Sequence, residues 1–154
     1  MGRFGYEKVY IITTILKYLK YYIPGLTSIL FIVILLMGEN YPTYFLIGFS
    51  LFIIVGDIIF PRDKEIEKFS YPSLLNLSIY INLPILFILV LLVVSIFSHN
   101  LSQWYIEVLD SYFYIDFMQI KNSFNIIDKI SLIIQTALSI GILGTVPGHE
   151  LTHR

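Results

Sequence analysis

The sequence contains no cysteine and few charged residues, and each shortage excludes a class of protein. Without cysteine there can be no disulfide, thiolate nucleophile, iron–sulfur cluster or Cys-ligated zinc, so any metal must bind to His, Asp or Glu. Charged residues make up 14% of the 154 residues, whereas a soluble domain has about 25%. The net charge of -1 leaves no basic excess to neutralise phosphates, so nucleic acid is not an expected partner.

Apolar residues are abundant instead. Hydrophobic side chains account for 56% of the sequence and aromatic ones for 16%, and the mean hydropathy is +0.78. A domain of this size leaves much of its surface exposed, so it cannot bury this much apolar surface in one core. We therefore expect the lipid bilayer to be its main partner.

Four long runs with almost no charge could each cross a membrane. A helical crossing needs about 20 mostly apolar residues. The runs cover residues 21–37, 41–60, 71–97 and 130–148, and Asp57 is the one acid inside them. Proline falls in the expected first turns, where its missing N–H costs little, at Pro24, Pro42 and Pro72. The sequence predicts an all-α integral membrane bundle of about four transmembrane helices.

The basic residues predict an orientation, because short cytoplasmic loops retain Lys and Arg. Eight of the ten precede the first run, separate the second from the third, or follow the fourth. We expect the N-terminus, the loop around Arg62 and the C-terminal histidines in the cytoplasm of a bacterial inner membrane. The turn at Glu39 and Asn40 then lies outside. The first apolar run is too long and begins too late for a secretory signal.

Residues 101–117 show the spacing of an amphipathic helix. Apolar side chains recur three and four residues apart, at Leu101, Trp104, Tyr105, Val108, Leu109, Tyr112 and Phe113. The polar face carries Glu107 and Asp110 rather than Lys, so attraction to anionic lipids is not its purpose. We expect an interfacial helix on the outer side of the membrane. Of its two possible roles, a linker in the interface and a lid over the bundle, we favour the linker.

Polar residues inside the runs have two expected roles. Those predicted to hydrogen bond between helices are Thr27, Ser28, Ser50, Asn76 and Ser78. Asp57, an acid near the end of its run, is either functional or simply within reach of water or Arg62.

The densest group of potential metal ligands is the segment from His149 to Arg154. Because His149 and His153 are four residues apart, a helix presents both imidazoles on one face, where they can bind one cation. The alternative is an incidental pair of histidines at a membrane boundary, which is also the expected role of His99. On a regular helix, a separate stripe of small residues available for close packing comprises Ala137, Gly141, Gly144 and Gly148.

The pattern H-E-x-x-H has a second known use. In zinc metalloproteases the two histidines bind Zn²⁺ and the glutamate activates water. An intramembrane zinc metalloprotease with Glu150 as general base therefore stays open as an alternative, as does a non-enzymatic membrane bundle.

The wider string Gly148-His149-Glu150-Leu151-Thr152-His153-Arg154 resembles the first histidine box of the membrane-bound alkane hydroxylase and xylene monooxygenase group, within the fatty-acid desaturase/hydroxylase superfamily. A less specific likeness is Gly56-Asp57 with Pro61 and Asp63. The resemblance implies a non-haem di-iron centre with His149 and His153 among its ligands. Such a centre uses O₂ to hydroxylate or desaturate an alkyl or fatty acyl chain, with electrons from a rubredoxin or ferredoxin-type donor and its reductase.

Within this resemblance, Glu150 is expected to orient a ligand imidazole rather than to act as a base. The group holds its two irons with several histidine boxes, and two imidazoles cannot replace them. We therefore interpret residues 1–154 as the N-terminal part of a single transmembrane domain, a fragment that is inactive on its own.

Overall fold

The computed structural model describes residues 18–19, 21–59 and 72–145. Within these ranges the regular structure is entirely helical, with no strand, which confirms the predicted all-α class. The elements are α2 (Ile23–Met37), α3 (Tyr41–Ile59), α4 (Pro72–Phe97), α5 (Gln103–Phe113), α6 (Phe117–Ser123), α7 (Ile126–Ile140) and the π-helix η1 (Gly141–Thr145).

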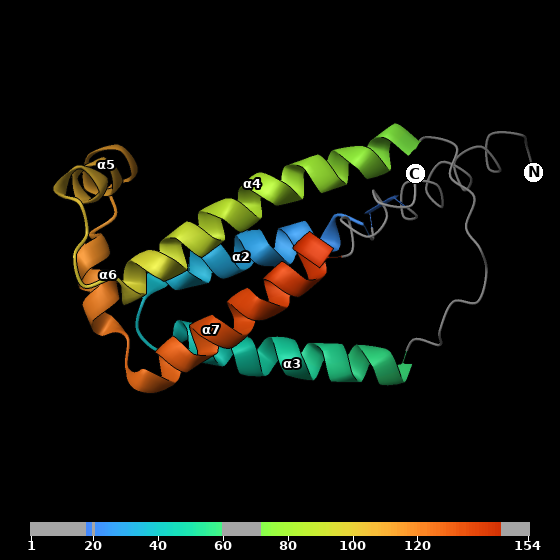
Figure 1. Cartoon of the computed structure of the whole chain (residues 1–154). Coiled ribbons are helices and arrows are strands. Elements are labelled where there is room, and N and C mark those ends of the chain that lie inside the picture. Colours follow the sequence, from blue (N-terminus) through green and yellow to red (C-terminus); the bar gives the residue numbers. More distant parts are fainter. Residues whose placement is uncertain (1–17, 20, 60–71, 146–154) are drawn as a thin grey trace, which may run out of the picture.

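The long helices α2, α3, α4 and α7 alternate in direction along the bundle (Figure 1). At one end lie α5, α6 and the turn between α2 and α3. At the opposite end lie the start of α2, the end of α3, the start of α4, and η1 (Figure 1). Helices α2 and α7 each contact the other three long helices, so these two helices form the centre of the described bundle.

Three helical segments in the described ranges are long and apolar enough to cross a membrane: Tyr41–Ile59, Asn76–Phe97 and Ile126–Leu143. Helix α2 is apolar but has 15 residues, so it spans about 22 Å of a hydrocarbon core about 30 Å thick. The structure therefore supports three candidate crossings, and the predicted fourth, at 21–37, is not confirmed.

Local signals explain where the helices begin. Pro24 and Pro42 occupy the first turns of α2 and α3, and Pro72 is the first residue of α4, as predicted. Helix α7 starts at Ile126 because Asn125 and Asp128 form a capping box. The helix therefore begins four residues before the predicted run 130–148, and the charged residues 128 and 129 lie inside it.

The tight turn between α2 and α3 depends on glycine. Gly38 has φ 75° and ψ -156°, a region that is essentially restricted to glycine. A Cβ at this position would lie 2.8 Å from Ser123 Oγ. The same hydroxyl accepts a hydrogen bond of 2.8 Å from the Glu39 amide, which ties the turn to α6.

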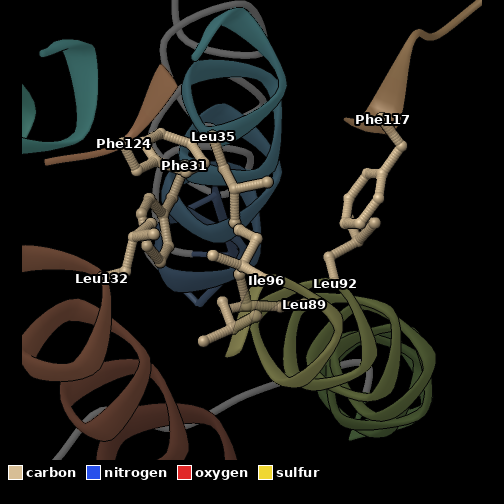
Figure 2. Packing of buried hydrophobic residues seen from close by; sticks show 9 residues of the cluster. Phe31, Leu35, Leu89, Leu92, Ile96, Phe117, Phe124 and Leu132 are labelled. Atoms are coloured by element: carbon tan, nitrogen blue, oxygen red, sulfur yellow. The ribbon is translucent and has the colours of Figure 1, made fainter. Parts of the chain in front are cut away.

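The hydrophobic core lies toward the α6 end of the bundle. Figure 2 shows side chains from α2, α4, α6 and α7 meeting there, among them Phe31, Leu35, Leu89, Ile96, Phe117 and Leu132. Helix α3 contributes little to this core. Its residues 51–59 are exposed except for Gly56, which is partly buried, and that half of the helix diverges from α2 and α4 (Figure 1).

Helix α5 is present where the sequence predicts an amphipathic helix, although it covers only Gln103–Phe113 of the predicted segment 101–117. It ends because Tyr114 adopts the left-handed conformation, with φ 55°. None of its residues is buried. Trp104, Tyr112 and Phe113 expose large aromatic surfaces at the end of the bundle (Figure 1).

Candidate functional site

The histidine box predicted to bind metal, including His149, Glu150 and His153, lies outside the described residues. The described part of this segment ends at Thr145 in η1, four residues before His149. The end of η1 lies at the bundle end where α2 and α4 begin and α3 ends (Figure 1). In the sequence, the segments that adjoin these four helix ends contain eight of the ten basic residues.

The described part of the chain contains no group of three or more His, Cys, Asp or Glu residues that could hold a metal ion. His99 is exposed just after α4, at the end of the bundle opposite η1, which is consistent with its predicted boundary role. Asp57 is exposed two residues before the end of α3. Arg62, which the sequence gives as one possible contact of Asp57, lies outside the described residues.

Within the described residues, no helix packs against the first two members of the predicted stripe of small residues on α7. Ala137 is exposed, and a Cβ added at Gly141 meets nothing within 4 Å. The buried face of α7 is instead formed by Asp128, Ser131, Leu132, Gln135 and Thr136. The predicted stripe assumed a regular α-helix, whereas Gly141–Thr145 form the π-helix η1. Gly148, the last member of the stripe, lies outside the described residues.

A buried polar cluster joins the start of α7 to the first turn of α3. Asp128 is 1% exposed, and its Oδ1 accepts a hydrogen bond of 2.5 Å from Thr43 Oγ1. Ser131 Oγ lies 3.2 Å from the same hydroxyl. Asp128 Oδ2 accepts from the Asn125 amide at 3.1 Å, and Asn125 Nδ2 donates to Asn40 Oδ1 at 2.9 Å. One carboxylate oxygen of Asp128 therefore holds α7 against α3, and the other caps the start of α7.

Gln135, two turns further along α7, is 4% exposed. Its Nε2 donates a hydrogen bond of 2.7 Å to the carbonyl oxygen of Pro42. Its Oε1 is buried and has no hydrogen-bond partner among the described residues. Because the Pro42 carbonyl can only accept, it requires the NH₂ group on its side, which fixes the orientation of the amide.

Gln135 also lines a cavity between α2, α3 and α7. Three stacked aromatic rings form much of its wall, with centroid distances of 5.9 Å between Phe31 and Phe45 and 5.6 Å between Phe45 and Phe49. Helix α7 and η1 add Leu138 and Leu143. The space for bound groups is about 30 Å³, against roughly 10–15 Å³ for one water.

Sequence reasoning found some of these polar contacts and missed others. Ser78 does bond between segments, donating to the Tyr21 carbonyl at 2.9 Å, whereas Thr27 donates to Pro24 of its own helix at 2.8 Å. The main contacts to α3, from Asp128 and Gln135, were not predicted. The pattern Asn125-x-x-Asp128 resembles a capping box and could have located the start of α7.

The chain matches no known family model, and comparisons with curated proteins and with solved structures found no similar protein.

Proposed function

We propose that this chain is the membrane-embedded N-terminal part of an O₂-dependent non-haem di-iron monooxygenase that hydroxylates or desaturates an alkyl or fatty acyl chain. The observation that carries the proposal is the box His149-Glu150-Leu151-Thr152-His153-Arg154, which follows a helical segment apolar enough to cross a membrane. Imidazole nitrogen is a suitable ligand for iron. Two imidazoles are too few for two irons, so the proposal requires further ligands from outside these 154 residues.

The arrangement of the bundle supports this proposal. The apolar helices are consistent with a bilayer, from which a hydrophobic substrate can be taken up. The end of η1, which precedes the box in the sequence, lies at the bundle end whose adjoining segments are rich in Lys and Arg. Such segments favour a cytoplasmic location. A rubredoxin or ferredoxin-type donor and its reductase could then deliver electrons from the cytoplasm. The exposed aromatic residues of α5 favour a position for that helix in the outer membrane interface.

Within this proposal the residues of the box have separate roles. His149 and His153 hold iron, and Glu150 accepts a hydrogen bond from the second N–H of a ligand imidazole, which fixes the ring orientation. The bound di-iron centre supplies O₂ activation for oxidation of an unactivated C–H bond. The main alternative is an intramembrane zinc protease, favoured by the H-E-x-x-H pattern itself, in which Glu150 is the general base.

The substitution Glu150→Gln separates these two roles in the full-length protein that contains this chain. The assay is O₂-dependent turnover of a medium-chain alkane or fatty acid with a supplied reductase. If Glu150 orients a ligand, turnover falls by about tenfold. A zinc protease with Glu150 as general base would show no such turnover, and its peptide hydrolysis would fall by roughly 10²- to 10⁴-fold. Glu107→Gln, on the exposed α5, is the matched control and should leave turnover unchanged.

Two results would contradict the proposal. The first is product that still forms without O₂. The second is near-complete loss of turnover in Glu150→Gln with the metal retained, which would rule out a role limited to orienting a ligand. Stoichiometric zinc together with peptide-bond cleavage would establish the protease alternative.

A further inference from the structure

The cavity between α2, α3 and α7 has hydroxyl side chains in its wall as well as aromatic rings. Thr27 and Ser28 come from α2, and Ser139 comes from α7. Ser28 is 4% exposed, and Ser139 is partly buried. No hydrogen bond joins the hydroxyl of either serine to another described residue. Each of these two hydroxyls can therefore both donate and accept a hydrogen bond.

These hydroxyls indicate a polar ligand, because the large majority of buried polar side-chain atoms in proteins have a hydrogen-bond partner. Thr27 adds a third group. Its hydroxyl donates to the Pro24 carbonyl at 2.8 Å, and its oxygen remains available as an acceptor. A buried water molecule needs two to four polar partners. The hydroxyls of Thr27, Ser28 and Ser139 can supply them.

The size of the cavity limits the ligand to small molecules. Its space of about 30 Å³ holds roughly two or three water molecules at 10–15 Å³ each. The end of an acyl chain makes no hydrogen bond, so in this place it would leave the serine hydroxyls without a partner. Water therefore fits both the size of the cavity and the hydroxyls in its wall.

The cavity lies near one end of the bundle, where water is close. Pro24, in its wall, is the second residue of α2, and Leu143, also in its wall, is the last residue of a candidate membrane span. Ser139 precedes Leu143 by four residues, a depth of about 6 Å at 1.5 Å per residue. The start of α2 and η1 lie at the same end of the bundle (Figure 1). Water therefore has a short path to the hydroxyls.

We propose that this cavity binds about two or three ordered water molecules when the bundle is embedded in a bilayer. The waters exchange hydrogen bonds with Ser28 and Ser139 and donate to the oxygen of Thr27, so they link α2 to α7 through hydrogen bonds. The stacked rings of Phe31 and Phe45 form an apolar part of the wall. This inference depends on the cavity and its hydroxyls, and does not rest on the histidine box or on the proposed oxygenase activity.

Radiolytic footprinting tests this site in the 154-residue chain reconstituted into phospholipid nanodiscs. A short X-ray pulse converts water into hydroxyl radicals that oxidise the side chains they contact, and mass spectrometry measures the oxidation of each residue. Phe31 lines the cavity and is 2% exposed, whereas the control Phe117 is 1% exposed in the core and does not line the cavity. With an anionic radical scavenger in the bulk solution, we expect oxidation of Phe31 and only background oxidation of Phe117.

Two results would overturn the proposal. Phe31 that is as well protected as Phe117 would show that the cavity is dry or filled by lipid. Oxidation of Phe31 that the scavenger abolishes would show that the radicals come from bulk solution and not from bound water.

Substitution of the serines then tests the role of their hydroxyls. Ser28→Ala combined with Ser139→Ala leaves one of the three hydroxyls, fewer than the two to four partners that a buried water needs. Oxidation of Phe31 should therefore fall to background in this double variant. Ser95→Ala is the control, because Ser95 is 8% exposed but donates to a carbonyl of its own helix. Unchanged oxidation of Phe31 in the folded double variant would refute the proposal, and the measurement on the unmodified chain remains decisive if that variant fails to fold.

Discussion

The hydrogen bond between Thr43 and Asp128 is expected to stabilise the packing of α7 against α3, and a double-mutant cycle can measure it. Thr43→Val removes the donor at nearly constant shape, and Asp128→Ala removes the acceptor together with the capping box. Loss of a cap costs about 1 kcal/mol, and hydrogen bonds between membrane helices are worth up to about 1.7 kcal/mol. Asp128→Ala alone should therefore lower the free energy of unfolding by about 2–3 kcal/mol.

The capping contribution is lost in both Asp128 variants, so it cancels in the cycle. The coupling energy then reports the contact between the two side chains. We expect about 1.5 kcal/mol, the upper part of the range for membrane helices, because the acceptor is a carboxylate that is 1% exposed. Unfolding by SDS in mixed micelles, followed by circular dichroism, gives the four free energies.

Asp110→Ala, on the exposed α5, is the control for removing an acid and should change stability by less than about 0.5 kcal/mol. Substitutions at independent sites add to within about 0.5 kcal/mol, so a smaller coupling energy would mean that the two side chains do not interact. Such a value would refute the inference that this contact holds the two helices together.

Three further predictions concern the turn, α5 and the orientation. Gly38→Ala should lower the free energy of unfolding by roughly 1–3 kcal/mol, because alanine does not tolerate this backbone conformation. The control Gly48→Ala, where a Cβ meets nothing within 4 Å, should raise it by about 0.5–1 kcal/mol. Equal effects of the two substitutions would contradict the turn geometry. The fluorescence of Trp104, the single tryptophan, should be quenched by lipids brominated near the glycerol backbone more than by lipids brominated at the chain ends. If neither lipid quenches the fluorescence, α5 does not lie in the membrane. Because the chain has no cysteine, the single substitutions Glu39→Cys and Arg154→Cys each introduce one thiol that an impermeant maleimide can label cleanly in intact cells. The Glu39→Cys variant should react and the Arg154→Cys variant should not, and the reverse would contradict the cytoplasmic position of the box.

The helices were predictable because long apolar runs in this sequence are bounded by charged residues or by proline. The same reasoning misplaced the start of α7. Asp128 and Lys129 were interpreted as residues that precede a membrane span, because a charge inside a run usually interrupts it. In the structure Asp128 is buried against Thr43 and caps its own helix, so its polarity is satisfied within the fold. This pairing depends on a contact over 85 residues of sequence, which no local pattern reveals.

The candidate site was less predictable than the fold. The stripe of small residues on α7 assumed a regular α-helix, whereas Gly141–Thr145 form a π-helix. Gln135 is visible in the sequence as a polar residue in an apolar run, but only the structure shows that one of its amide atoms is bonded and the other is not. The spacing of His149 and His153 indicates a shared helix face, and their geometry lies outside the described residues.

Metal content tests the central proposal most directly. The full-length protein that contains this chain should be purified from iron-replete cells and its metals measured by mass spectrometry, alongside His149→Ala, His153→Ala and the control His99→Ala, which changes an exposed histidine at the other end of the bundle. The proposal predicts about two Fe and little Zn per chain. In the two box variants the affinity for iron should fall by more than the 10–100-fold that is typical when a group that orients a ligand is changed, so the iron content should also fall. The iron content should be unchanged in His99→Ala. Iron retained in full by both box variants, or stoichiometric zinc in place of iron, would contradict it.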